Sequence, residues 1–239
     1  MVRRLGLVLP FVAVLLVGCP APVPDSSSRV EGTVVFPGGV PVLGIGMVIS
    51  DTTVAPTGLT ASALTELGGG IYATPTQPVA ANGAFQLRLP GVEGLTYEVF
   101  RRADEFLYNV DGVADCSLVA DPLGVDVTGH VFDEKGSYPG FYGVHANGLA
   151  LSVVTETPVD VNDLAAYPGR FLAWVFARSP VAVATVGSGC LPKLDVELEL
   201  ERGWNVLGWT YDVATNGFTV RSVDDLGDVI VTLLPTPTP

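Results

Sequence analysis

The clearest alternation of apolar and polar positions in the chain lies between residues 194 and 201. Four aliphatic residues interleave there with four acidic ones: Leu194, Val196, Leu198 and Leu200 with Asp195, Glu197, Glu199 and Glu201. Because successive side chains of a strand point to opposite faces, this period of two predicts a strand with one buried face and one row of solvated carboxylates. Carboxyls on a single strand face do not oppose each other across a cleft, so the row does not predict a glycosidase acid pair.

Short segments of similar character recur along the chain, separated by turn residues. Asn-Gly pairs at 82–83, 147–148 and 216–217 indicate turns, the last of them a hairpin. Strands are expected at 30–36, 42–50, 84–90, 96–101, 106–110, 118–120, 125–132, 149–155, 181–186, 204–211, 218–223 and 228–234. Helical periodicity is nearly absent, and only single helical turns are expected, near 62–67 and 160–166.

One strand breaks the alternation. Phe171–Ala177 is apolar at every position, so we expect it to be buried on both faces. Apolar residues make up 48% of the chain and charged residues 15%, and 28 glycines with 19 prolines supply many turns. Together these features predict an all-β fold, an antiparallel β-sandwich with little helix.

The domain organisation follows from where the pattern stops. Residues 30–234 are expected to fold as the all-β body, with a division into two packed β subdomains near 102–115 as the alternative. Within it, 52–78 is rich in Thr, Ala, Gly and Pro and is expected to be a long irregular excursion. A short Pro/Thr tail follows at 235–239.

The first residues predict where the protein is located. Arg3 and Arg4 precede thirteen uncharged residues, 5–17, a run too short to span a bilayer but typical of an export signal. The sequence Leu-Val-Gly-Cys that ends at Cys19 resembles a bacterial lipobox. Residues 1–18 are therefore a predicted lipoprotein signal peptide, Cys19 is the predicted lipidation site, and 19–29 form a Pro/Ser-rich tether. The protein is expected to be extracytoplasmic and anchored to the membrane of the cell envelope.

The charge of the chain limits its partners. The net charge is −13, and removing residues 1–18 with their two arginines makes it −15. An acidic chain repels nucleic acid and anionic lipid headgroups, so neither is an expected partner. The expected attachment to the membrane is the lipid on Cys19, and a further partner is expected to be an envelope protein or a glycan.

The remaining cysteines, Cys116 and Cys190, form a pair in a compartment where disulfides persist. We predict a disulfide between them, because disulfides persist in this compartment and these two cysteines remain once Cys19 is assigned to the lipid. Two buried free thiols are the alternative.

Groups that could perform catalysis are sparse in this sequence. His130 and His145 are the only histidines, and the sequence contains neither a G-x-S-x-G elbow nor the H-E-x-x-H or CxxC spacing of a zinc site. Each histidine is therefore interpreted as a loop or sheet residue with ordinary hydrogen bonds. We expect no enzyme activity and no cofactor.

Two binding hypotheses remain. Calcium prefers several flexible oxygen ligands, and two loops offer them: Asn109, Asp111 and Asp115 around Gly112, and Asp224, Asp225 and Asp228. Acidic turn residues without a metal are the alternative, because neither loop matches the EF-hand pattern. Trp204, Trp209 and Tyr211 suggest an aromatic platform for sugar rings, with core packing as the alternative.

Two resemblances concern larger parts of the chain. A G-x-V strand followed by N-G-x-F-x-L-x-L-P resembles small transthyretin-like or carboxypeptidase-regulatory-like β-domains of bacterial envelope proteins. It is carried by Gly32, Val34, Asn82, Gly83, Phe85, Leu87, Leu89 and Pro90. The second half resembles uncharacterised secreted bacterial lipoproteins at Cys116, Asp121-Pro122, Trp174, Cys190 and residues 200–206. These resemblances imply a β fold and an envelope location and carry no activity.

The sequence therefore predicts a lipid-anchored envelope protein with a non-catalytic β-sandwich module that binds a ligand or has a structural role. The alternative is a carbohydrate-binding or carbohydrate-processing envelope enzyme, which would need converging polar groups near exposed aromatic side chains.

Overall fold

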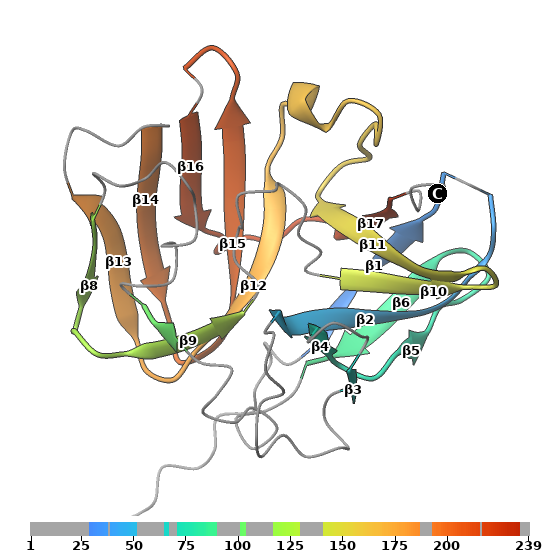
Figure 1. The fold of residues 1–239 in the computed structure, drawn as a ribbon, viewed down its shortest axis with the longest axis horizontal. Coiled ribbons are helices and arrows are strands. Elements are labelled where there is room, and N and C mark those ends of the chain that lie inside the picture. Colours follow the sequence, from blue (N-terminus) through green and yellow to red (C-terminus); the bar gives the residue numbers. More distant parts are fainter. Residues whose placement is uncertain are drawn as a thin grey trace, which may run out of the picture.

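The fold is all-β, as predicted, and its strands form two lobes that lie side by side (Figure 1). The computed structural model describes residues 29–37, 39–51, 65–66, 71–89, 101–103, 117–129, 141–186, 193–215 and 217–234. Across these ranges the only helical element is the 3-10 turn η4 (Leu164–Ala166), inside the segment 160–166 where a helical turn was predicted. The Asp163 carboxylate caps this turn by accepting from the Ala166 amide.

The first lobe is assembled from segments far apart in the chain. Its main strands are β1 (Arg29–Val35), β2 (Val42–Asp51), β5 (Gln77–Pro78), β6 (Ala84–Arg88), β10 (Phe141–His145), β11 (Gly148–Thr155) and β17 (Ile230–Leu233). They pair in the order β6-β1-β17-β11-β10-β2-β5, and a bridge between Val79 and Phe85 brings the ladder back to β6. Only the β1–β17 pairing is parallel in this lobe's described ladder.

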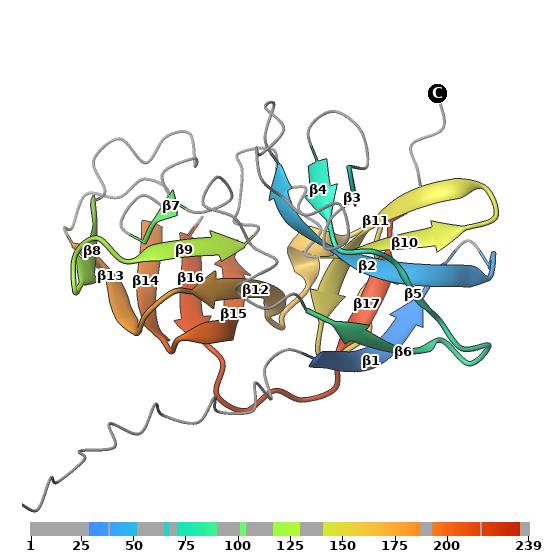
Figure 2. The same ribbon diagram turned by 90° about the horizontal axis from the view of Figure 1, so that it is seen from below.

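The second lobe is a curled sheet at the other side of the molecule (Figure 2). Its strands are β7 (Arg101–Arg102), β8 (Ser117–Asp121), β9 (Asp126–Gly129), β12 (Phe171–Ala177), β13 (Val181–Val186), β14 (Lys193–Leu200), β15 (Gly203–Asp212) and β16 (Gly217–Ser222). The order across the sheet is β7-β9-β12-β15-β16-β14-β13-β8. β14 and β16 are parallel, and the other pairs are antiparallel.

Strand β12 belongs to both cores, which confirms the prediction that it is buried on both faces. Leu172, Trp174 and Phe176 pack into the first core, whereas Val175 and Ala177 pack into the second. A strand with a polar face could not fill this position, because that face would be buried without hydrogen-bond partners. The FLAWVFA segment therefore joins the two lobes.

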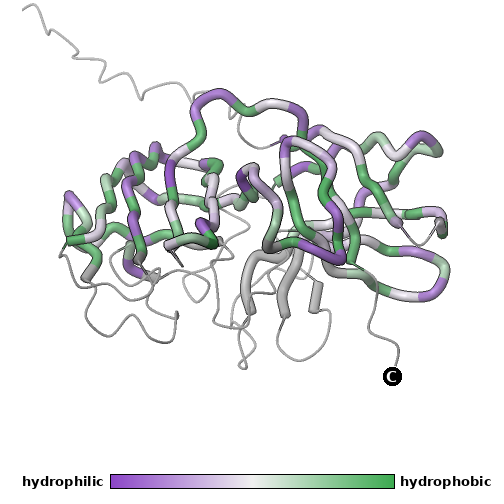
Figure 3. The backbone as a smooth tube through the Cα atoms, turned by 90° about the horizontal axis from the view of Figure 1, so that it is seen from above, coloured by the Kyte–Doolittle hydropathy of each residue, from purple (hydrophilic) through white to green (hydrophobic). Residues whose placement is uncertain are grey.

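The second core follows the alternation that the sequence predicted for β14. Val196, Leu198 and Leu200 are at most 3% exposed, while the acidic residues between them are exposed. Figure 3 shows hydrophobic and hydrophilic positions alternating along the strands of this lobe. The buried side chains pack against those of β8, β9, β12, β13, β15 and β16 in one cluster.

In the first lobe, β1 and β6 bring together the residues of the transthyretin-like pattern. Gly32 lies opposite Phe85, and the Val34 amide donates to the Gly83 carbonyl at 2.8 Å. A β-carbon at Gly32 would lie 2.3 Å from the Val229 carbonyl oxygen, so no larger residue fits there without backbone movement. Gly83 has φ of +84°, which favours glycine at this turn. The spacing thus reflects one cross-strand contact, and the resemblance itself stays a prediction.

Three expectations differ from the structure. The predicted helical turn at 62–67 is wrong where it can be compared, because Thr65–Glu66 forms strand β3 against β4 (Ile71–Ala73). The excursion at 52–78 accordingly contains short strands, and β4 also pairs with the end of β2. A division near 102–115 does not separate the lobes, because β10, β11 and β17 follow it in sequence and complete the first lobe. Strand pairing decides these three outcomes, locally for β3 with β4 and over long range for β10, β11 and β17, and composition does not indicate it.

Other predicted segments lie wholly or partly outside the described residues. These are the strand at 106–110, most of the strand at 96–101, the end of the strand at 125–132, the tether and the C-terminal tail.

Candidate functional site

A row of aromatic side chains lies at one end of the curled sheet of the second lobe. Trp209 stacks on Phe171, with ring centroids 4.4 Å apart, and lies 6.1 Å from Phe218. Tyr211 lies 4.8 Å from Phe218, and Tyr167 meets Phe171 edge-on at 5.1 Å. We call these five residues the aromatic row.

The register of the strands explains this row. In the β15–β16 hairpin, Tyr211 lies opposite Phe218, and the β12–β15 ladder places Trp209 opposite Phe171. Aromatic pairs directly opposite each other on one sheet face stabilise the ladder. Phe171 is 6% exposed and the other four rings are half-buried, so the row presents aromatic surface, while Trp209 also packs against the second core.

Trp204 does not belong to this surface, and its prediction as a platform residue is corrected. It is 5% exposed, packs in the first core and meets Phe176 edge-on at 5.5 Å. The alternation of β15 is the reason, because Trp204 and Val206 face the first core whereas Leu207 and Trp209 face the second. Trp209 and Tyr211 remain the candidates at which a sugar ring could stack.

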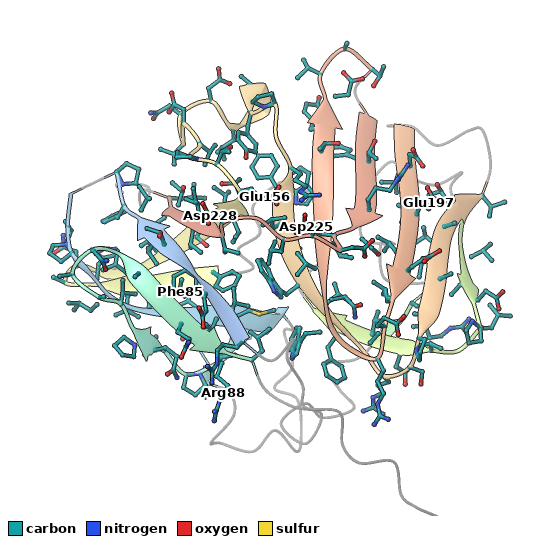
Figure 4. All side chains as sticks on the ribbon, turned by 180° about the vertical axis from the view of Figure 1, so that it is seen from behind. Phe85, Arg88, Glu156, Glu197, Asp225 and Asp228 are labelled. Atoms are coloured by element: carbon teal, nitrogen blue, oxygen red, sulfur yellow. The ribbon has the colours of Figure 1, made fainter. Side chains whose placement is uncertain are left out.

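The second predicted calcium loop connects the two lobes. Asp224, Asp225 and Asp228 are exposed in the segment between β16 and β17, near the line where the lobes meet (Figure 4). Within the described part of the chain, no group of three His, Cys, Asp or Glu side chains is arranged to hold a metal ion. The described structure therefore does not bring these three carboxylates together as a metal site, and calcium binding at this loop stays a prediction. The geometry favours the alternative of acidic turn residues.

This connecting segment is held by an ion pair that sequence reasoning missed. Arg170 donates to Glu156 through Nε at 2.6 Å and Nη2 at 2.7 Å, and through Nη2 to the Asp225 carbonyl at 3.2 Å. The Gly227 amide donates to Glu156 Oε1 at 3.1 Å. We call Glu156, Arg170 and the segment 225–227 the inter-lobe clamp. The hydrogen bond from Arg170 is the main cause that lowers the pKa of Glu156, and the Gly227 amide acts in the same direction.

The acidic row of β14 is solvated, as predicted, and is partly neutralised by the neighbouring parallel strand. Arg221 on β16 pairs with Asp195 at 2.6 Å and with Glu197 at 3.5 Å. Asp195 and Glu197 are 63% and 76% exposed, so these ion pairs contribute little to stability. The local pattern of β14 could not indicate Arg221, because the parallel β14–β16 pairing is non-local.

Polar side chains at the turns of the second lobe bind the backbone. Asn205 accepts from the Glu201 amide and donates to the carbonyls of Glu201 and Gly203. Asp212 accepts from the Ala214 amide and from the Thr215 hydroxyl. These contacts shape the turns on either side of β15.

His145 is a strand residue at the end of β10, and it is 6% exposed. Its ring stacks on Phe36 at 4.9 Å, and Nδ1 accepts from the Asn147 amide at 3.2 Å. Among the described residues, the buried Nε2 has no hydrogen-bond partner. The single ordinary hydrogen bond fits the sheet role predicted for this histidine.

Several residues for which the sequence predicts a role lie outside the described residues, so their roles stay predictions. They are the lipidation site Cys19, the cysteine pair Cys116 and Cys190, the first calcium loop with Asn109, Asp111 and Asp115, and His130.

Comparison with known proteins gives no relative: neither a family model nor a curated protein nor a solved structure matches this chain. In the described residues, none of the helical structure is long and apolar enough to cross a membrane.

Proposed function

We propose that this protein is a lipid-anchored component of the cell envelope whose two-lobed β body is a non-catalytic binding or structural module. The observation that supports a structural or binding module is the sharing of β12 between the two cores, because it joins the lobes through buried side chains, and the lipobox-like sequence that ends at Cys19 supports the anchor. The polar contacts of the second lobe fit this role. Asn205, Asp212 and the inter-lobe clamp use their hydrogen bonds to hold turns and strands together.

Membrane fractionation with mass analysis of the N-terminus tests the anchor. The native protein is expected in the membrane fraction with acyl chains on Cys19, and Cys19→Ala is expected in the soluble fraction. Membrane association of Cys19→Ala, together with a native protein that carries no acyl chains, would contradict the proposal.

Carbohydrate binding by the module is a second candidate, and the half-buried aromatic row favours it. Aromatic faces with neighbouring polar groups are suited to sugar rings, and the Asp212–Thr215 turn follows Tyr211 directly. Stacking of Trp209 on Phe171 commits part of this surface to internal packing, which makes the structural role the first choice.

A glycan array followed by titration tests this second candidate. Binding should weaken at least tenfold in Tyr211→Ala and stay unchanged in Val213→Ala, a neighbouring side chain that is 64% exposed. Absence of any bound glycan, or equal loss in both variants, would exclude the row as a sugar site.

A further inference from the structure

Two arginines face each other where the folded body begins. Arg29 is the first residue of β1, Arg88 is the last residue of β6, and the register places them directly opposite each other. Both are exposed, while the adjacent Val30 and Leu87 are buried in the first core. Figure 4 shows Arg88 at the lower edge of its lobe, with its side chain pointing away from the body.

This arrangement carries an electrostatic cost that its neighbours compensate only in part. Like charges directly opposite each other on neighbouring strands are destabilising. Among the described residues, neither guanidinium forms an ion pair or a hydrogen bond with another side chain. Glu31 is the next residue of β1 on the same face, and its carboxylate, which accepts from the neutral amide of Gln86, offsets only one of the two positive charges. An anion between Arg29 and Arg88 would remove the repulsion.

The place of this pair in the chain indicates which anion reaches it. Arg29 is ten residues from Cys19, and a semi-extended tether of this length reaches about 30 Å at most. A body held by a lipid on Cys19 therefore carries this end close to the bilayer. Lipid phosphates are the anions most concentrated there.

We propose that Arg29 and Arg88 together bind the phosphates of anionic phospholipid headgroups and dock the body against the bilayer. This inference rests on the lipid anchor proposed above. The guanidinium group presents several N–H donors in a planar fork that matches phosphate oxygens. Docking by two arginines adds to the anchor and orients the module.

The acidity of the whole chain does not oppose this contact at short range. Charges separated by more than about 10 Å are largely screened at 0.1 M salt, so the local sign decides. The exposed carboxylates of β14 are on the second lobe, and Figure 4 shows Glu197 far across the molecule from Arg88. The expected exclusion of anionic headgroups, based on net charge, therefore does not hold for this edge.

Energy transfer from the three tryptophans to dansyl-labelled headgroups measures how close the body lies to the membrane. The lipidated full chain is reconstituted into vesicles of phosphatidylcholine alone or with phosphatidylglycerol. Transfer should be higher with the anionic lipid, and the difference should disappear in high salt. Each arginine should change the docked-to-free ratio about fivefold, and the two together about twenty-five-fold.

Single variants with equal charge change supply the matched comparison. The anionic increment is the extra energy transfer seen in vesicles that contain phosphatidylglycerol. Arg88→Gln and Arg29→Gln should each reduce this increment, and the double variant should abolish it. Arg221→Gln removes the same charge from the second lobe and should leave the increment unchanged. The variant Arg29→Lys/Arg88→Lys should keep part of it. Equal transfer in both vesicle types for the native protein, or an unchanged increment in Arg29→Gln/Arg88→Gln, would overturn the inference.

The outcomes separate this inference from the anchor itself. A native protein without acyl chains that does not float with vesicles refutes the proposed anchor. An acylated protein that floats with vesicles but shows no arginine-dependent increment refutes only the headgroup contact. Thermal melting of each variant checks that it folds, and exposed Arg→Gln changes are expected to alter stability by little.

Discussion

The two lobes reach the same kind of architecture by different routes. In the second lobe, β12 to β16 follow one another in the chain, and the alternation in β14 and the turn after β15 predict them locally. In the first lobe, the ladder joins residues 29–51, 77–88, 141–155 and 230–233, and β17 comes last in the chain but lies between β1 and β11. Short-range patterns therefore describe the second lobe better than the first, whose closure depends on non-local pairing.

The shared strand should give the largest effect. Trp174 is 3% exposed and meets Phe141 of the first lobe edge-on at 5.0 Å, although its strand lies in the sheet of the second. Trp174→Ala should lower the free energy of unfolding by about 3–5 kcal/mol, through lost burial and a cavity. Chemical denaturation followed by circular dichroism measures this change.

The same experiment tests whether the lobes unfold together. Leu198→Ala, in the second core alone, serves as the comparison and should lower the same single transition. Two separate transitions in the native protein, of which Leu198→Ala shifts only one, would show that β12 does not couple the lobes.

Alkaline pH should weaken the first lobe through Tyr142. Its ring fills the space over Gly46, its hydroxyl donates to the Thr74 carbonyl at 2.7 Å, and burial raises its pKa to about 12. The folded state therefore favours the neutral phenol, so its contribution is complete below pH 10 and is lost as pH rises from 10 towards 12. A shift of this size corresponds to about 2–3 kcal/mol.

Stability measured from pH 9 to 12 checks this expectation. Tyr142→Phe removes the titrating group, so it should lose less stability across that window than the native protein. It should also be about 1 kcal/mol less stable at neutral pH, because the Thr74 carbonyl loses its donor. Parallel pH curves for the two proteins would contradict the assignment.

The inter-lobe clamp should give a smaller effect. Because the pKa of Glu156 is lowered in the folded state, the clamp stabilises the protein above the unfolded value near 4.5 and is lost as pH falls through the lower, folded value. Glu156→Gln should cost about 1 kcal/mol at pH 7, since both partners are partly exposed. It should also flatten the stability curve below pH 4.5.

Asp160→Asn is the matched control for the clamp, because Asp160 is an exposed carboxylate in the same loop that bonds Asn162. It should leave the loss of stability below pH 4.5 unchanged. If Glu156→Gln and the native protein lose stability equally below pH 4.5, the clamp does not cause that loss.

The smallest effect is expected on the acidic face of the second lobe. Arg221→Gln removes the exposed ion pairs with Asp195 and Glu197 and should change the free energy of unfolding by at most about 1 kcal/mol. Raising the salt concentration should shrink the difference. A loss of several kcal/mol that salt does not reduce would mean that Arg221 has a buried role.

The sequence predicted part of the candidate site. It identified Trp209 and Tyr211, but Phe218 follows only when the hairpin register is used to place it opposite Tyr211. Tyr167 and Phe171 come from a preceding loop and a neighbouring strand, so local spacing could not join them to the row. Trp204 was misplaced because an aromatic residue on a strand does not by itself indicate which face is covered.

Periodicity in this chain was sufficient to establish an all-β fold, the solvated acidic face of β14 and a strand buried on both sides, because each depends on side chains a few residues apart. The tertiary structure decided which two cores β12 joins. It also decided that Glu156 and Arg170 hold the segment between β16 and β17, and that Arg29 lies opposite Arg88. These contacts join residues up to dozens of positions apart, and their free energy appears only when the strands pair. Local pattern specifies strands and faces, whereas long-range register specifies neighbours.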